Sequence, residues 1–209
     1  MKPSLKLTLA GILLFSSSAA FAQDSAEKSA GDPENGKKLS QTCVACHGTD
    51  GNSTNPIWPK IAGQHSSYLV KQLVDFKSDK RKDALMKGIV APLSPHDMAD
   101  LSAYFSRQST KPGSADESMV ALGKALYKGG NLQTKVAACA ACHSPEGKGN
   151  PAAKYPRVSG QHAEYLVKQL KSFKSGERAN DIGSIMRDIA GKMTEVEIEA
   201  VSQYMSGLK

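Results

Sequence analysis

Apolar positions recur with the period of an α-helix in several parts of the chain. Residues 66–78 carry Leu69, Leu73 and Phe76 on one face, and residues 163–175 repeat that spacing. Two further helices are predicted over residues 36–43 and 118–129, opening near Gly36 and Gly123. The two-residue alternation of a β-strand is missing around the cysteine motifs described below. The pattern therefore predicts an all-α protein.

Two more helices are predicted from the residues that would start them. Ser94 can cap a helix whose first residue is Pro95, and Thr194 with Glu197 three positions later forms a capping box. Apolar pairs flank both caps at the spacing of a hydrophobic staple: Leu93 with Met98, and Met193 with Ile198. The staples predict that these residues are structural.

The chain is internally duplicated. Residues 63–81 (GQHSSYLVKQLVDFKSDKR) and 160–178 (GQHAEYLVKQLKSFKSGER) are identical at 13 of 19 positions, and the segment from Met86 maps onto the segment from Met186. We therefore predict two copies of one fold. Their predicted bounds are 23–108 and 118–209, joined by a linker of small, polar and turn-forming residues at 109–117.

The first residues have the pattern of an export signal. Lys2 and Lys6 precede an apolar stretch from Leu7 to Phe15, and Ala20-Phe21-Ala22 forms a small-x-small cleavage site. The apolar stretch is shorter than the ~20 residues that a membrane-spanning helix needs. We therefore expect residues 1–22 to be a cleaved signal peptide.

The charge of the mature chain bears on its partners. After residue 22 the chain holds 25 Lys and Arg against 20 Asp and Glu, and residues 111–209 hold 14 of the basic and 10 of the acidic residues. This excess is too small and too interleaved with acids for a nucleic-acid-binding protein. It is consistent with steering toward an acidic partner or with a plain solvated face, and it leaves peripheral membrane association open.

The four cysteines form two Cys-x-x-Cys-His motifs, the attachment signature of c-type haem. Two thiols bond to the haem vinyl groups, and the histidine that follows binds the iron. A Cys2His2 zinc site would need two histidines three to five residues apart, and no such pair exists in the chain. We therefore predict two covalent haem c groups, attached at Cys43 and Cys46 and at Cys139 and Cys142, with His47 and His143 on the irons.

Comparing the two copies separates the methionines. Met98, Met193 and Met205 align with Ile, Leu or Phe in the other copy, which indicates packing positions. By contrast, Met86 and Met186 align with each other, 39 and 43 residues after their haem histidines. Since methionine sulfur is the usual sixth ligand of a high-potential carrier, these two are the predicted axial ligands.

Histidine is the rival sixth ligand. His65 and His162 align with each other, but both follow Gly-Gln directly before a predicted helix, where polar residues are common. We therefore assign them a role at the surface or at the helix start rather than on iron. His96 follows Pro95 at another helix start, and we expect it to be exposed.

The two halves of about 90 residues resemble the cytochrome c4 family, whose members are periplasmic and contain two class I cytochrome c domains. The likeness covers nearly all of the chain after the leader and includes NPIWPKIAGQ, KYPRVSGQ, LYKGGNLQTKVAACAACH and MRDIAGKMT. The resemblance implies an all-α fold of two tandem domains, each wrapped around one covalent haem. It also implies that the haem propionates approach each other across the interface between the domains.

The resemblance also implies the residues on and near each iron. These are His47 with Met86 and His143 with Met186 as ligands, and Pro59 and Pro156 as backbone acceptors for the histidine rings. Such an acceptor fixes the orientation of the ring and the basicity of the ligand.

The expected function is one-electron transport in the periplasm, between a quinol-oxidising membrane complex and an acceptor such as a terminal oxidase. Two alternative functions remain. The first is that of the electron-accepting dihaem subunit of a flavin or quinone dehydrogenase. The second is that of an enzyme, such as a dihaem peroxidase or a haem oxidase of small sulfur compounds. An enzyme needs an open iron position, and the aligned methionines argue against one.

Overall fold

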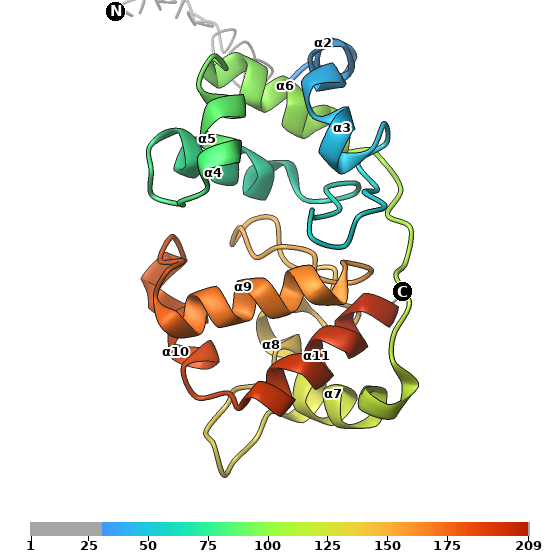
Figure 1. The fold of residues 1–209 in the computed structure, drawn as a ribbon, viewed down its shortest axis with the longest axis vertical. Helices are drawn as coiled ribbons and strands as arrows, with labels where there is room; N and C mark the ends of the chain where they lie inside the picture. The colour runs from blue at the N-terminus through green and yellow to red at the C-terminus, as the bar shows by residue number, and fades with distance from the viewer. Residues whose placement is uncertain (1–30, 209) are drawn as a thin grey trace, which may run out of the picture.

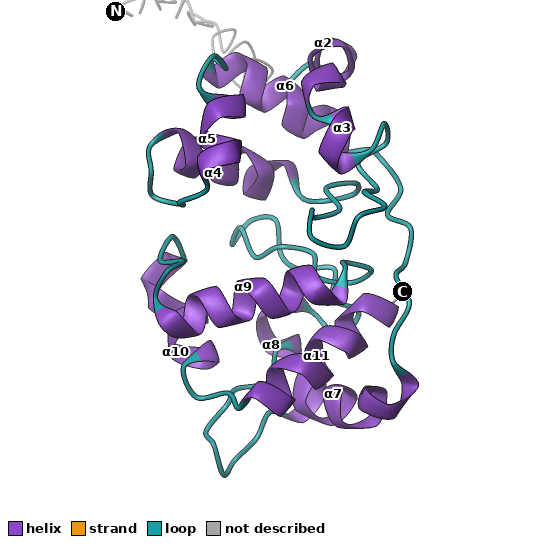
Figure 2. Cartoon of the chain, in the orientation of Figure 1, coloured by secondary structure: helices purple, strands orange, loops and turns teal. Residues whose placement is uncertain are grey.

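The computed structural model describes residues 31–208, and this part of the chain is helical (Figure 2). It contains two isolated β-bridges, Asn131 with Val136 and Asn150 with Tyr155, but no strand. None of the helices in this range is long and apolar enough to cross a membrane. The predicted signal peptide, residues 1–22, lies outside the described residues.

The α-helices fall into two sets with the same order, while the short 3-10 helix of each set occupies a different place in it (Figure 1). The first half holds α2 (Pro33–Leu39), η1 (Ser40–Thr42), α3 (Val44–His47), α4 (Ser66–Lys77), α5 (Ala84–Val90) and α6 (Pro95–Ser106). The second half holds α7 (Glu117–Gly129), α8 (Ala140–His143), α9 (Ala163–Ser175), η2 (Ile182–Ser184), α10 (Ile185–Ala190) and α11 (Glu195–Gly207). The duplication seen in the sequence is therefore also a duplication of structure.

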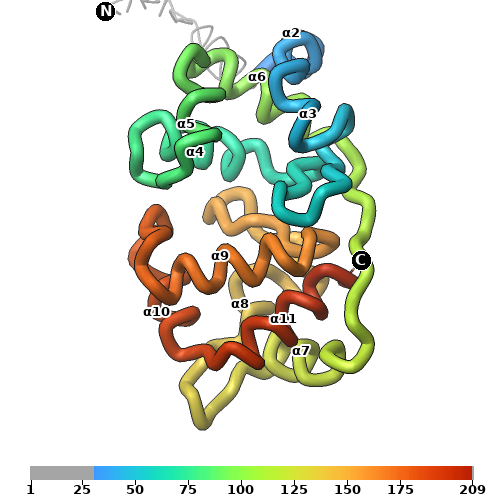
Figure 3. The backbone as a smooth tube through the Cα atoms, in the orientation of Figure 1, coloured from blue at the N-terminus to red at the C-terminus, as the bar shows by residue number. Residues whose placement is uncertain are grey.

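A segment without helix joins α6 to α7 and runs along one edge of the molecule (Figure 3). Thr110 Oγ1 donates a hydrogen bond to the Ala62 carbonyl of the first half at 2.6 Å. Gly113 N–H donates to the Ser206 carbonyl of the second half at 3.1 Å. The segment is thus bonded to both halves, and the bounds of the domains and linker stay predictions.

The amphipathic helices begin and end close to where the sequence predicts them. α9 covers residues 163–175, and α4 ends one residue before the predicted 78. In α9 the apolar face formed by Leu166, Leu170 and Phe173 is buried. Burial of such a face, rather than helix propensity alone, stabilises a helix of this length.

The predicted caps also form. Ser94 Oγ accepts from Asp97 N–H at the start of α6, and Thr194 Oγ1 accepts from Glu197 N–H at the start of α11. Asp97 and Glu197 each complete a capping box by accepting from the backbone N–H of the cap residue. Met98, Met193 and Met205 lie in the core, with exposures of 2%, 2% and 5%, as the alignment of the copies predicts.

The prediction that the first helices open near Gly36 and Gly123 is wrong. α2 begins at Pro33 behind an Asp32 cap and α7 at Glu117 behind an Asp116 cap, so both glycines are interior. A Cβ at Gly36 would lie 2.0 Å from the Asp100 carbonyl oxygen, and one at Gly123 would lie 2.0 Å from that of Ala200. These glycines let α2 cross α6, and α7 cross α11, at close range.

Gly123→Ala should therefore destabilise the second half by about 1–3 kcal/mol, the usual cost of overpacking a core. The new methyl group would meet backbone atoms of α11, which cannot rotate away. Thermal unfolding of the holoprotein measures the effect. Gly129→Ala is the matched control because it lies in the same helix with nothing within 4 Å, and an equal loss in both variants would contradict the crossing argument.

Glu197 links α11 to the loop before the second cysteine motif. Its carboxylate accepts from Asn131 Nδ2 at 2.7 Å and from Thr194 N–H at 2.7 Å. Burial raises the pKa of Glu197, but these hydrogen bonds outweigh burial and hold the pKa below its ordinary value of 4.5. The ionised form is therefore favoured by folding.

Glu197→Ala should cost about 1–3 kcal/mol at pH 7, because it removes several hydrogen bonds to a buried, charged acceptor. A lowered folded-state pKa means that the contribution is fully present above the unfolded pKa and is lost as the pH falls through the folded one. Chemical denaturation at several pH values should show the gap to the natural protein closing below about pH 4. Glu199→Ala on the same helix serves as control, and a gap that stays constant in acid would refute the assignment.

Candidate haem-binding sites

Each cysteine motif folds into a single helical turn. In the first half α3 places His47 N–H 2.9 Å and Cys46 N–H 3.3 Å from the Cys43 carbonyl oxygen. In the second half α8 repeats this turn around Cys139, Cys142 and His143. A turn of this kind keeps both thiols and the imidazole of a motif within reach of one macrocycle.

All four cysteines are half-buried beside their histidines, and no disulfide joins any of them. Burial raises the pKa of Cys139 to about 11 and also raises the pKa of Cys43. The Cys43 and Cys139 thiols therefore resist ionisation at neutral pH. None of them forms a disulfide with its partner in the motif, so both sulfurs of each motif are free to form thioether bonds.

Both histidines of the motifs are buried and held by a proline carbonyl. His47 Nδ1 lies 2.8 Å from the Pro59 oxygen, and His143 Nδ1 lies 2.9 Å from the Pro156 oxygen. Since a carbonyl only accepts, Nδ1 carries the proton in both rings and Nε2 keeps a lone pair for a metal. Burial lowers the pKa of both imidazoles, which favours the neutral form that binds iron. The donor set thus fits a c-type haem in each half.

The two aligned methionines lie on short helices that the periodicity of the sequence does not predict. Met86 is partly buried in α5, where its N–H donates to the Asp83 cap at 3.0 Å. Met186 is partly buried in α10. Asp181 anchors that helix by accepting from Arg187 N–H at 3.1 Å and from Arg187 Nε at 2.8 Å. An aspartate therefore holds each methionine-bearing helix at its start.

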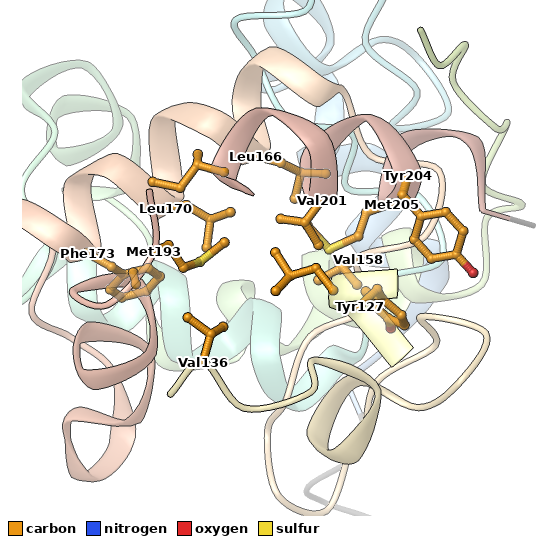
Figure 4. Close-up of a cluster of buried hydrophobic side chains, with 13 residues drawn as sticks. Tyr127, Val136, Val158, Leu166, Leu170, Phe173, Met193, Val201, Tyr204 and Met205 are labelled. Carbon is orange, nitrogen blue, oxygen red and sulfur yellow. The ribbon is translucent and has the colours of Figure 1, made fainter. Parts of the chain in front are cut away.

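The core of the second half packs against both the haem-attachment turn and the helix that carries Met186. Figure 4 shows side chains of α7, α9 and α11, with Val136, Val158 and Met193 from the loops, pointing toward a common interior. Cys139 and Met186 both pack against this cluster. One apolar core thus contacts the haem-attachment turn and the methionine-bearing helix.

The two halves meet through α4 and α9, which face each other in Figure 1. His65 and His162 occupy the N-cap positions of these helices without making a side-chain capping bond, which confirms a position at the helix start. Their side chains, however, reach the other half. His65 Nε2 lies 2.7 Å from the Lys148 carbonyl oxygen and His162 Nε2 lies 2.9 Å from that of Ser53. Both rings therefore contact the other half across the interface.

His96, by contrast, is exposed as the sequence predicts, with a side-chain exposure of 74%.

Reciprocal polar contacts extend along both helices. Arg81 Nη2 donates to Tyr165 Oη at 2.9 Å, and Arg178 Nη2 donates to Tyr68 Oη at 3.0 Å. Each guanidinium also lies over a phenylalanine ring of its own half, at 4.6 and 4.4 Å from the centroid. Such mutual exchange of equivalent contacts is the mark of a two-fold related interface. The signal for it in the sequence is the repeat itself, which keeps these Tyr and Arg residues identical in both copies.

The comparisons with known proteins agree with this geometry. The cytochrome c family model matches residues 33–109 and again residues 120–209. Cytochrome c4 of Thiocapsa roseopersicina is 47% identical over 180 residues, covering 85% of this chain and 93% of the relative. The crystal structure of reduced recombinant cytochrome c4 from Pseudomonas stutzeri has a TM-score of 0.84 and 44% identity, covering 86% of this chain and 100% of that chain. The thiosulfate dehydrogenase electron acceptor of Thiomonas intermedia is 34% identical over 170 residues, covering 79% of this chain and 77% of the relative.

Each of the two matched segments contains one Cys-x-x-Cys-His motif. The chain therefore carries two covalently bound haem c groups, and it is an electron carrier rather than an enzyme. The likeness to relatives and to a solved structure covers both halves, and it confirms the resemblance drawn from the motifs. This chain belongs to the cytochrome c4 family of dihaem c-type cytochromes.

Proposed function

We propose that this protein shuttles electrons one at a time in a periplasmic respiratory chain. The donor would be a quinol-oxidising membrane complex and the acceptor a terminal oxidase. The proposal is supported by two observations: each half has a buried histidine fixed by a proline carbonyl, and each half has a partly buried methionine on a short helix. Together these residues suit a site that exchanges electrons without binding a substrate.

The proposed iron ligands are His47 with Met86 and His143 with Met186. When bound, haem supplies reversible one-electron exchange between ferrous and ferric iron. The proton on Nδ1 of each histidine would leave Nε2 to bind the iron, and the thioether of each methionine would favour the ferrous state and hence a high potential. With these four residues as ligands, neither iron would keep a position for peroxide or another substrate.

The proposed location and partners rest on the sequence. Residues 1–22 have the pattern of an export signal, and attachment of haem c through thioether bonds suits an exported protein. Most of the positive charge lies in residues 111–209, which would steer this half toward an acidic docking site and make association sensitive to salt. Peripheral association with the membrane would keep the protein close to the quinol-oxidising complex proposed as its donor.

An anaerobic redox titration of the mature holoprotein, followed by optical spectra, tests the proposal. We expect two one-electron waves at positive potential, low-spin spectra throughout, and the weak far-red band of methionine bound to ferric iron. A high-spin component, or binding of carbon monoxide at neutral pH by the untreated protein, would mean that one methionine is not a ligand. Function in a substrate-binding enzyme would then have to be considered again.

A second function has a specific observation in its favour. The similarity to a thiosulfate dehydrogenase electron acceptor suggests that the chain accepts electrons from a dehydrogenase rather than from a quinol-oxidising complex. Pull-down from the native periplasm, followed by reduction assays with each captured protein, separates the two. Fast reduction by a captured dehydrogenase, with slow reduction by quinol-oxidising membranes, would favour the second function.

A further inference from the structure

One peptide group in the first half is hydrogen-bonded on both of its sides. Its carbonyl, that of Pro59, accepts from His47 Nδ1 at 2.8 Å. Its N–H, that of Lys60, donates to Gln161 Oε1 of the second half at 2.8 Å. Gln161 Nε2 in turn donates to the Lys60 carbonyl at 2.8 Å. A side chain of one half thus continues the hydrogen-bond chain that begins at the imidazole of the other half.

The second half repeats this arrangement with the roles exchanged. His143 Nδ1 lies 2.9 Å from the Pro156 oxygen, and the N–H of the same peptide, that of Arg157, donates to Gln64 Oε1 at 2.9 Å. Gln64 Nε2 donates to the Arg157 carbonyl at 2.9 Å. Gln64 and Gln161 are the aligned glutamines of the repeated Gly-Gln-His sequence. Each half therefore supplies the glutamine that binds the peptide group holding the histidine of the other half.

These glutamines are held in one orientation. Gln64, Gln161 and Lys60 are each 8% exposed, so their bonds lie away from water. Each Oε1 also accepts from the next N–H of its own chain, that of His65 at 3.1 Å and that of His162 at 3.0 Å. With the oxygen bound to two N–H groups and the nitrogen to a carbonyl, neither amide can turn over without losing its partners.

Hydrogen bonds in series polarise one another, by roughly 10–30% per bond. An N–H that donates to a glutamine oxygen pushes electron density toward the carbonyl of the same peptide, which then holds the imidazole proton more strongly. A histidine held in this way donates more strongly to a metal and is fixed in its ring orientation. Stronger donation stabilises ferric iron over ferrous iron.

We propose that Gln161 is a positioning residue for the haem of the first half and Gln64 for the haem of the second half, so that each half tunes the potential of the other. The inference rests on the iron ligands proposed above. It gives the interface a role in setting the haem potentials. Separating the halves would break the bonds from Gln161 and Gln64 to the peptide groups that hold the two histidines.

The test is a pair of variants, Gln161→Met and Gln64→Met, which keep a long side chain but remove the amide. Gln161→Met should raise the potential of the first-half haem alone, so that its ferrous-to-ferric ratio at a fixed solution potential rises several-fold. Gln64→Met should do the same to the second-half haem alone. Proton NMR during the titration follows the two haems separately, and the Met86→His and Met186→His variants assign each wave to its half.

A second readout is local to the ring. In ferrous protein, the Nδ1 proton of His47 should exchange with solvent faster in Gln161→Met, while that of His143 keeps its rate. Tyr165→Phe is the control, because it removes one contact across the same interface, from Arg81, and touches neither peptide. It should leave both potentials in place.

Unmoved potentials, equal shifts of both haems, or the same shift in Tyr165→Phe would overturn the inference. If one glutamine variant does not fold, its mirror variant tests the same relation from the other half. Failure of the proposed function is seen separately, in the natural protein. A missing far-red methionine band there removes the ligand assignment, whereas a normal spectrum with unmoved variants removes only the cross-half tuning.

Discussion

Replacing Met86 with histidine should lower the potential of the first-half haem by on the order of 0.2 V, since axial ligands set haem potentials over roughly 0.8 V. Imidazole donates more strongly than a thioether and therefore stabilises ferric iron. The site tolerates the change because Met86 is only partly buried and the neighbouring Leu85 is 56% exposed. In a redox titration, one of two waves should move down and the far-red band should lose half of its intensity.

The two copies supply the controls for this prediction. Met186→His should move the other wave, and the double variant should move both. Met98→Leu replaces a methionine that is 2% exposed in the core, so it should cost less than about 1.5 kcal/mol and move neither wave. Should Met86→His leave both waves in place, the ligand of the first-half haem is not Met86, and the assignment by alignment of the copies fails.

Long helices with an apolar face of their own could be predicted from the sequence, whereas short helices that depend on tertiary packing could not. α4 and α9 have three turns with a complete apolar face, so their periodicity is visible in the sequence. The short helices α3, α5, α8 and α10 have four to seven residues, too few to show a period, and they depend on tertiary packing. Gly36 misled for a related reason. Whether a helical glycine starts a helix or admits a crossing helix depends on a partner far along the chain.

The residues of the candidate sites also differ in how far the sequence predicts them. Spacing alone identifies Cys43, Cys46 and His47, because thioether attachment needs those residue types in one turn. The cross-half contacts of Gln64 and Gln161 could not be derived from spacing, because they join residues 93 and 101 positions apart. The repeat did contain a sign of them. Its identical residues include polar ones that no apolar face explains, and the glutamine, histidine, tyrosine and arginine pairs among them bond across the interface.

Removing the haem attachment of the first half should unfold that half. In the described part of the chain, the first half buries six apolar side chains to below one-tenth exposure, whereas the second half buries fourteen. Full burial of a Val, Leu, Ile, Phe or Met side chain stabilises by about 1.5–3 kcal/mol, against a total stability of roughly 5–15 kcal/mol for a domain. The first half therefore depends more on the apolar surface of its haem, and Cys43→Ala with Cys46→Ala takes away the bonds that hold it.

We expect this double variant to carry one haem per chain, to show one redox wave, and to lose helical circular dichroism. Limited proteolysis should cut within the first half while the second half stays protected. Cys139→Ala with Cys142→Ala is the matched variant, and it should also lose one haem but keep more of its structure, because the cluster around Leu166 and Val201 contains more buried apolar side chains than the first half does. Equal loss of structure in the two variants would show that haem, and not the number of buried side chains, sets the stability of both halves.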